Sequence, residues 1–291
     1  MKAVVAVVLC TFLSAPLTVF AQNSNHADST HLLGVIVGGD NQQPLAYASV
    51  GLLNKPVGTV ADSSGYFDLT VGSEYMDDTL QVTMVGYWTV KGLVKEFKKT
   101  DGRMVISLSE KVTLLNEVVV NNQFAHTVII VRQSSGSFIQ VSLIPKGSRP
   151  PTIGAESGLK IQAPHYPALL DNFNFYLSGN NFRYVKFRLN IYSLNDNLPD
   201  TLLFNKEILV SLNNFKTGWT RVDLTTDDLV IHGDCAITLQ WVDFNKDMTK
   251  SPELLIPTGV SLSYINFFRT ASQDKWHSVK GNPSFYITLR D

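Results

Sequence analysis

Charge is scarce in this sequence of 291 residues. Charged residues make up 17% of the chain, and 24 Lys and Arg stand against 25 Asp and Glu. Nucleic acids and anionic lipids select proteins with basic runs or patches, so neither is expected as the principal partner. No stretch reaches the ~18 consecutive apolar residues that span a bilayer, so no transmembrane span is expected in the mature chain. Hydrophobic residues amount to 44%, which is enough to form a buried core.

The N-terminus has the pattern of a secretory leader. Lys2 supplies a positive charge, residues 3–15 form a short apolar run, and Ala21 places a small residue before Gln22. This pattern predicts a signal peptide over residues 1–21, cleaved between Ala21 and Gln22. The alternative, a buried helix or membrane anchor, fits poorly because the run is short and Pro16 interrupts it. Residues 22–31 are polar and predict a flexible N-terminal segment.

Cysteine is nearly absent, with two residues in the whole chain. Cys10 lies inside the leader and follows Leu9 in the middle of the apolar run, which argues against a lipid anchor. Removal of the leader leaves Cys235 alone, so no internal disulfide can form. An exported protein of this composition must be stabilised by packing.

Catalytic and metal-binding motifs are also missing. The six His residues stand singly, and none has a Glu three positions later. The sequence contains no His-Glu-x-x-His motif, no paired-Cys site and no Gly-x-Ser-x-Gly elbow. We therefore expect no enzyme, no metal and no cofactor. A Ser/His/Asp triad assembled from distant residues keeps a hydrolase open as a third choice.

Helical periodicity is almost absent as well. Short alternating segments recur between Gly, Asn, Asp and Pro clusters, which is typical of an all-β chain. The best helix candidate, residues 90–99, contains Gly92 and predicts at most a short connector. A polar and Ser-Gly-rich stretch at residues 121–136 predicts a linker between a first domain at 32–120 and a second domain at 137–291.

The first domain carries several ordered motifs. They are the strand at residues 34–37, the segment at 43–50, the turn and strand at 58–69, and the strands at 80–87 and 106–108. Asp62 and Gly65 frame a tight turn. Together these segments resemble the carboxypeptidase regulatory-like domain, a seven-stranded prealbumin-like β-sandwich.

The resemblance implies a cell-envelope setting. Residues 114–120 resemble the segment that follows this domain at the N-terminus of TonB-dependent outer-membrane transporters. A transporter would need several hundred more residues for its membrane barrel, so this sequence is not expected to be one. Zinc carboxypeptidases carry the module as an accessory, so the resemblance does not imply catalysis.

The second domain predicts about eight antiparallel strands, which suits a jelly-roll-like β-sandwich. The strands are expected near residues 137–144, 173–178, 184–193, 203–212, 219–225, 235–242, 260–268 and 284–290. This region resembles, more weakly, the β-sandwich that often follows the first module in exported envelope proteins. Carbohydrate-binding jelly rolls are distant look-alikes of that fold.

Two segments of the second domain are candidate ligand contacts. Asp243, Asn245 and Asp247 have the alternate spacing of a calcium loop, but Met248 and Leu254 replace the Gly and Glu of an EF-hand, which favours a solvated turn. Trp276 lies in a polar segment, where an exposed ring could stack on a sugar. If the two segments share one end of the sandwich, Trp276 and the carboxylates could form a glycan site.

The sequence thus predicts a non-catalytic exported binding or scaffold protein, periplasmic or associated with the outer membrane. In the first hypothesis, the first domain docks on an envelope protein. In the second, the second domain binds a surface glycan through Trp276. The third is the hydrolase.

Overall fold

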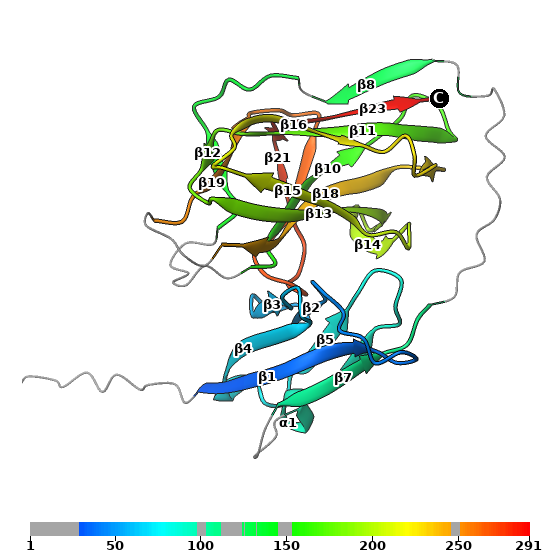
Figure 1. The fold of residues 1–291 in the computed structure, drawn as a ribbon. Coiled ribbons are helices and arrows are strands. Elements are labelled where there is room, and N and C mark those ends of the chain that lie inside the picture. Colours follow the sequence, from blue (N-terminus) through cyan, green and yellow to red (C-terminus); the bar gives the residue numbers. More distant parts are fainter. Residues whose placement is uncertain are drawn as a thin grey trace, which may run out of the picture.

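The computed structural model describes residues 29–97, 103–111, 124, 126–131, 133–144, 153–245 and 251–291. The predicted cleavage site at Ala21 and Gln22 lies outside these residues, as do Asp247 and residues 114–120. The described part is almost wholly β, as predicted, and two β-rich units follow one another along the chain (Figure 1).

The first domain contains seven strands among its described residues, which confirms the predicted number and the sandwich architecture. One sheet has the order β4-β1-β7 and the other has the order β3-β2-β5-β6. The elements are β1 (Ser29–Gly38), β2 (Ser49–Leu52), β3 (Gly58–Val60), β4 (Tyr66–Gly72), the 3-10 turn η1 (Ser73–Tyr75), β5 (Thr79–Thr83), β6 (Val90–Leu93), α1 (Val94–Phe97) and β7 (Met104–Leu108). The short α1 lies inside the segment expected to be at most a helical connector.

Alternation along the strands builds the core of the first domain. In β4, Phe67, Leu69 and Val71 are buried while the residues between them face outward. The turn before β4 forms as predicted, since one Asp62 carboxylate oxygen accepts the backbone N–H groups of Ser64 and Tyr66. Gly65 takes the positive φ of +73° that this turn requires.

The second domain is a sandwich of two larger sheets. The first has the order β14-β13-β18-β10-β20-β21 with β15 also on β13, and we call it the large sheet. Its strands are β10 (Glu156–Ile161), β13 (Tyr184–Asn195), β14 (Leu198–Leu202), β15 (Ile208–Asn213), β18 (Cys235–Phe244), β20 (Ile265–Arg269) and β21 (His277–Lys280). The facing sheet has the order β16-β11-β23-β8 with β17 also on β11. It consists of β8 (Thr127–Val131), β11 (Ala168–Leu177), β16 (Gly218–Asp223), β17 (Val230–Ile231) and β23 (Phe285–Arg290).

Aromatic and aliphatic side chains fill the space between these sheets. Phe175 of β11 meets Phe187 of β13 edge to face at 5.7 Å between ring centroids. Trp241 of β18 is fully buried in the same core. A smaller sheet closes one end of the sandwich through β9 (Gln140–Ser142), β12 (Gly179–Asn180), β19 (Leu254–Gly259) and β22 (Asn282–Pro283).

Each of the eight predicted strand ranges overlaps a strand, but the structure adds others. The sequence pattern does not predict β10, because Ser157 and Gly158 break the apolar alternation. It does not predict β19 either, because that strand contains Pro257. The predicted linker at 121–136 also needs correction, because β8 lies inside it. This strand pairs with β23 along its length, so the second sandwich begins at Thr127.

The two domains contact each other directly. The first domain meets the outer face of the large sheet with the edge that carries β2, β3 and β5 (Figure 1). The loop between β20 and β21, residues 270–276, reaches the same junction. This contact surface is called the seam below.

Candidate functional site

The loop at residues 270–276 joins the seam through Gln273. Its side-chain amide donates to the Thr83 hydroxyl at 2.7 Å and accepts from the Gln81 amide at 2.6 Å. Its backbone carbonyl accepts the N–H of Asn54 at 2.8 Å. Gln273 is itself buried, so three hydrogen bonds across the seam replace its contact with water.

Glycine lets the two backbones approach at this point. A Cβ atom at Gly51 or at Gly58 would overlap the carbonyl oxygen of Ser272. The two glycines belong to β2 and β3, which pair with each other opposite the loop. The hairpin of the first domain is therefore shaped to receive a loop of the second.

Arg188 of β13 extends the seam. Its Nη2 donates to the Tyr47 carbonyl at 2.5 Å and to Glu207 at 2.7 Å, and its Nη1 donates to Gln240 at 3.2 Å. Tyr47 holds a positive φ of +61°, an uncommon conformation for a bulky residue. The Gln240 amide also donates to the Ser49 hydroxyl at 3.2 Å.

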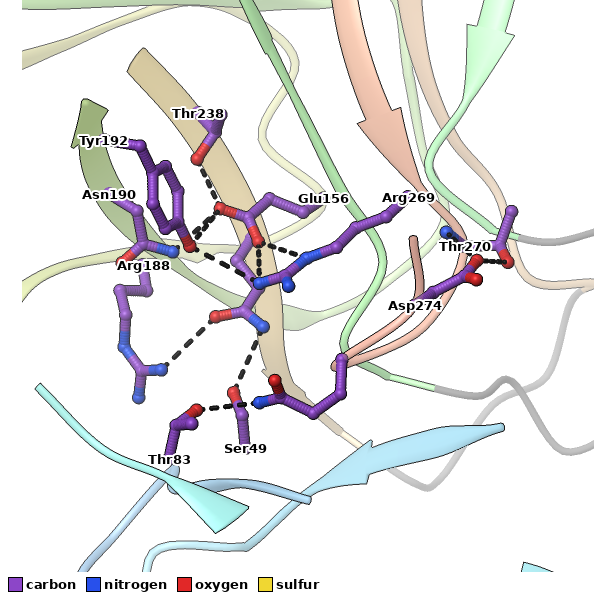
Figure 2. Close-up of polar contacts among 12 residues, drawn as sticks. Ser49, Thr83, Glu156, Arg188, Asn190, Tyr192, Thr238, Arg269, Thr270 and Asp274 are labelled. Carbon is purple, nitrogen blue, oxygen red and sulfur yellow. Dashed lines mark hydrogen bonds and ion pairs between the residues drawn. The ribbon is translucent and has the colours of Figure 1, made fainter. Parts of the chain in front are cut away.

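A buried carboxylate lies behind these contacts (Figure 2). The Glu156 side chain has no exposed surface. One of its carboxylate oxygens accepts hydrogen bonds from Arg269 Nε at 2.9 Å and Nη2 at 2.5 Å. Its other oxygen accepts from the Asn190 amide at 2.8 Å, the Tyr192 hydroxyl at 3.1 Å and the Thr238 hydroxyl. Four neighbours thus satisfy both oxygens of this carboxylate.

The buried cluster shifts the proton affinities of its members. Burial and then the Glu156 charge raise the pKa of Tyr192. Burial disfavours the charged form of Arg269, but the Glu156 carboxylate outweighs it and the pKa of Arg269 is raised. Both groups therefore keep their protons, which is the arrangement of a structural ion pair.

Trp276 packs over this cluster instead of standing alone in solvent. Its ring lies 5.6 Å from the Tyr192 ring and 4.6 Å from the Arg269 guanidinium. Leu194 and Leu198 belong to the same partly buried apolar group. The half-buried indole therefore covers the Glu156–Arg269 pair, with one part of its surface still exposed.

Asp243 and Asn245 lie elsewhere on the large sheet. Asp243 lies 3.5 Å from the hydroxyls of Tyr47 and Tyr184, and Asn245 accepts the backbone N–H of Tyr184 at 3.0 Å. Tyr192, under Trp276, pairs with Ala236, seven positions from Asp243 along β18. That separation is about 20 Å along a strand, so the structure does not bring Trp276 and Asp243 together.

The described part of the chain offers no acidic or sulfur cluster in place of the predicted candidates. In the described ranges, no three His, Cys, Asp or Glu side chains gather as metal ligands would. Cys235 is buried, and desolvation raises the pKa of its thiol to about 12. Nor does any helix of the described chain have the length and apolarity to cross a membrane.

One end of the second domain exposes apolar side chains. Phe138 is fully exposed, and Val260 and Leu262 expose 84% and 80% of their surface. We call this region the end surface and define it by these three residues together with Ile139, Tyr264 and Val279, which are also exposed. Phe138 and Val260 line one hollow, and exposed apolar side chains that gather in this way mark interaction sites on folded proteins.

Hydrogen bonds hold the two loops of the end surface in place. The Ser137 hydroxyl donates to the Thr258 carbonyl at 2.7 Å and accepts the Ile139 N–H at 3.2 Å. The Ser261 hydroxyl accepts the N–H groups of Ser263 and Tyr264, each at 3.2 Å. The exposed rings and methyl groups are thus presented on braced backbone, which lowers the ordering cost of binding.

A hollow of about 730 Å³ lies between these loops. Its lining consists of Gly136, Ser137, Phe138, Gly259, Val260, Ser261 and Asn282. Two of the three segments that line it, residues 133–144 and 254–268, contain no charged residue, and the third carries Lys280 two positions before Asn282. Sequence patterns do not predict this site, because its apolar residues follow no motif and only the pairing of β9 and β22 with β19 joins the two loops.

Comparison with known proteins identifies the first domain. Residues 32–120 match the family model described as CarboxypepD_reg-like domain, which confirms the resemblance and its range. None of the curated proteins matched the chain.

Two solved structures give partial likenesses. The first holds the cysteine protease and lectin-like domains of Cwp84, a surface-layer-associated protein of Clostridium difficile, at 8% identity and a TM-score of 0.41. The match covers 80% of this chain and 45% of that one. The second is the clostridial Cwp84 protease after propeptide cleavage, at 9% identity, a TM-score of 0.41, and 84% and 65% coverage. The chain thus spans less than two thirds of either structure.

Proposed function

We propose that this protein is a non-catalytic binding or scaffold protein of the cell envelope that contacts a partner protein through the end surface. The observation that supports the proposal most is the near-complete exposure of Phe138, Val260 and Leu262 on braced loops. Protein interfaces use such an apolar, charge-poor centre.

The location in the proposal comes from the leader and from the first domain. A signal peptide over residues 1–21 would export the chain, and the CarboxypepD_reg-like domain at 32–120 is of a type found in exported envelope proteins. Both support a periplasmic or outer-membrane-associated protein.

The domains have different roles in this proposal. The sequence favoured docking by the first domain, but part of that domain faces the second across the seam. We assign the first domain to support and the second to binding. The absence of catalysis rests on the sequence, which lacks the motifs of hydrolases and metalloenzymes.

Binding to isolated envelopes tests the proposal. Labelled mature protein should bind envelopes of the native host saturably, and protease treatment of the envelopes should abolish binding. The double variant Val260→Ser, Leu262→Ser should lose binding, while Val105→Ser, which changes an exposed residue of the first domain, should keep it.

Two outcomes would contradict the proposal. Loss of binding with Val105→Ser but not with the double variant would assign docking to the first domain. Binding that survives protease but is lost after periodate oxidation of the envelopes would favour a surface glycan.

A further inference from the structure

The strand β8 forms one edge of the facing sheet (Figure 1). Among the described strands it pairs with β23 alone. His126, just before β8, exchanges two backbone hydrogen bonds with Asp291, at 3.3 and 3.1 Å. Because such pairs alternate along an antiparallel ladder, Val128 and Ile130 bond to β23, and the N–H and C=O of Ile129 point away from it. The outer side of β8 therefore presents backbone donors and acceptors for another strand.

The side chains of β8 do not protect this edge. Sheet edges are normally protected by charged side chains or by Pro. Three other edge strands of the second domain follow that rule, since β16 carries Arg221 and Asp223, β14 carries Pro199, and β21 carries Lys280. The sequence of β8 is Thr-Val-Ile-Ile-Val, in which every residue is β-branched and none is charged. Ile129 exposes 52% of its surface, so the edge is open to a partner.

The two faces of β8 set the chemistry of a strand that could pair with it. On the inner face, Val128 and Ile130 pack against the core of the second domain but stay partly exposed. On the outer face, Ile129 lies opposite Thr288 of β23. A pairing strand must therefore bring uncharged, apolar or β-branched side chains to both faces at successive positions.

A second copy of β8 meets these requirements. If two copies pair antiparallel about a two-fold axis at Val128 or Ile129, β-branched residues lie opposite β-branched residues on both faces. No like charges oppose each other, because the strand has none. The partly exposed Val128 and Ile130 of each copy then cover those of the other. A two-fold interface of this kind is closed, so association stops at two copies.

We propose that the mature protein forms a homodimer in which two β8 strands pair antiparallel and join the two facing sheets into one continuous sheet. The contact uses none of the residues that define the end surface, so the proposal is independent of the proposed function. A pair of five-residue strands is small beside the ~1,600 Å² of a standard interface, and we expect a dissociation constant of about micromolar.

Sedimentation velocity over a concentration series tests the proposal. The parent protein should show a monomer–dimer equilibrium. Ile129→Lys should raise the dissociation constant about tenfold or more, because two lysines would then face each other across the axis. Ile129→Pro, which removes the outward N–H, should do the same, and Ile129→Val should leave the constant unchanged.

The fold of the variants can be checked separately. Since the Ile129 backbone does not bond to β23, Ile129→Lys should unfold in denaturant close to the parent protein. If Ile129→Pro fails to fold, Ile129→Lys still decides.

Cross-linking locates the contact. Ile129→Cys treated with a short bis-maleimide should give a covalent dimer, because opposite and diagonal residues of paired strands lie within about 8 Å of each other. Val105→Cys, at an exposed residue of the first domain, should stay monomeric under the same treatment. Cys235 is buried and should not react.

Three outcomes would overturn the proposal. They are a monomer at every concentration, a dimer unaffected by Ile129→Lys, and a dimer that is lost with Val260→Ser, Leu262→Ser, since the last result would assign self-association to the end surface. Envelope binding keeps the two proposals apart. Binding that is lost with Val260→Ser, Leu262→Ser and kept with Ile129→Lys would support the proposed function, whatever the oligomeric state.

Discussion

At the scale of single residues, Glu156 is the most consequential side chain of the buried cluster behind the seam. Its ion pair with Arg269 is buried, and removal of one member leaves the other charge without a partner. Glu156→Gln should therefore lower the free energy of unfolding by about 3 kcal/mol, measured by denaturant titration. Asp68→Asn, which breaks an exposed contact with His31, should leave that free energy within experimental error.

The double variant Glu156→Leu, Arg269→Leu checks the cause of this loss. Because neither charge is left buried alone, the double variant should lose less stability than the sum of the two single variants. Additive losses would contradict a direct ion pair.

Tyr166 predicts a dependence of stability on alkaline pH. Burial is the largest cause that raises its pKa to about 12, and the hydrogen bond from its hydroxyl to Asp234 at 2.9 Å adds to it. A folded pKa above the unfolded value near 10 means that this group stabilises the fold fully below about pH 10. That contribution is lost as the pH rises towards 12.

Comparison with the Tyr166→Phe variant separates the contribution of Tyr166 to this pH dependence from those of the other tyrosines. The parent protein should lose free energy of unfolding more steeply between about pH 10 and 12 than the variant does. Parallel pH profiles would show that Tyr166 titrates alike in the folded and unfolded chains.

At the scale of elements, the β2–β3 hairpin must lack side chains where it meets the loop at 270–276. Gly58→Ala would place a methyl group against the Ser272 carbonyl and should destabilise the protein by about 1–3 kcal/mol in denaturant titration. Gly233→Ala is the matched control, because nothing lies within 4 Å of its added Cβ. Equal losses of stability from the two substitutions would mean that the change in backbone conformational freedom, and not the contact with Ser272, causes the loss.

Strands with strict alternation could be predicted from sequence, and strands defined by distant partners could not. The alternating residues of β13 and β16 were recognisable at once, but β19 has Pro257 in its middle and β10 has Gly158. These two strands are stabilised by neighbours on both sides, which local composition does not reveal.

In the candidate site too, local sequence patterns predict some features, while contacts between distant residues decide others. Trp276 was singled out because its neighbours in sequence are polar, yet Tyr192 and Arg269 from two other strands cover its ring. Phe138 and Val260 lie 122 positions apart and follow no motif, although both line one hollow. Non-local pairing decides which side chains meet, and a single sequence does not encode it in a local pattern.

At the scale of the whole molecule, the seam should hold the two domains together after the chain is cut. The sequence predicts proteolysis within residues 121–136, and β8 removes residues 127–131 from that window because they pair with β23. Limited proteolysis should cut before Thr127, and the two fragments should co-elute in size-exclusion chromatography.

The contacts of the seam provide the control for that experiment. Arg188→Ala together with Gln273→Ala removes hydrogen bonds to Tyr47 and Thr83 and should let the cut fragments separate. Fragments of the parent protein that separate without these substitutions would show that the seam is too weak to unite the domains.

The central claim is that the end surface meets a partner protein in the envelope. Its most direct test is a photoreactive amino acid placed at position 262 of the full chain in the native host, with the same residue at position 105 as control. Illumination should give one discrete adduct from position 262, with an envelope protein identified by mass spectrometry, and none from position 105. No adduct from position 262 in a protein that fractionates with the envelope, or the same adduct from both positions, would contradict the claim.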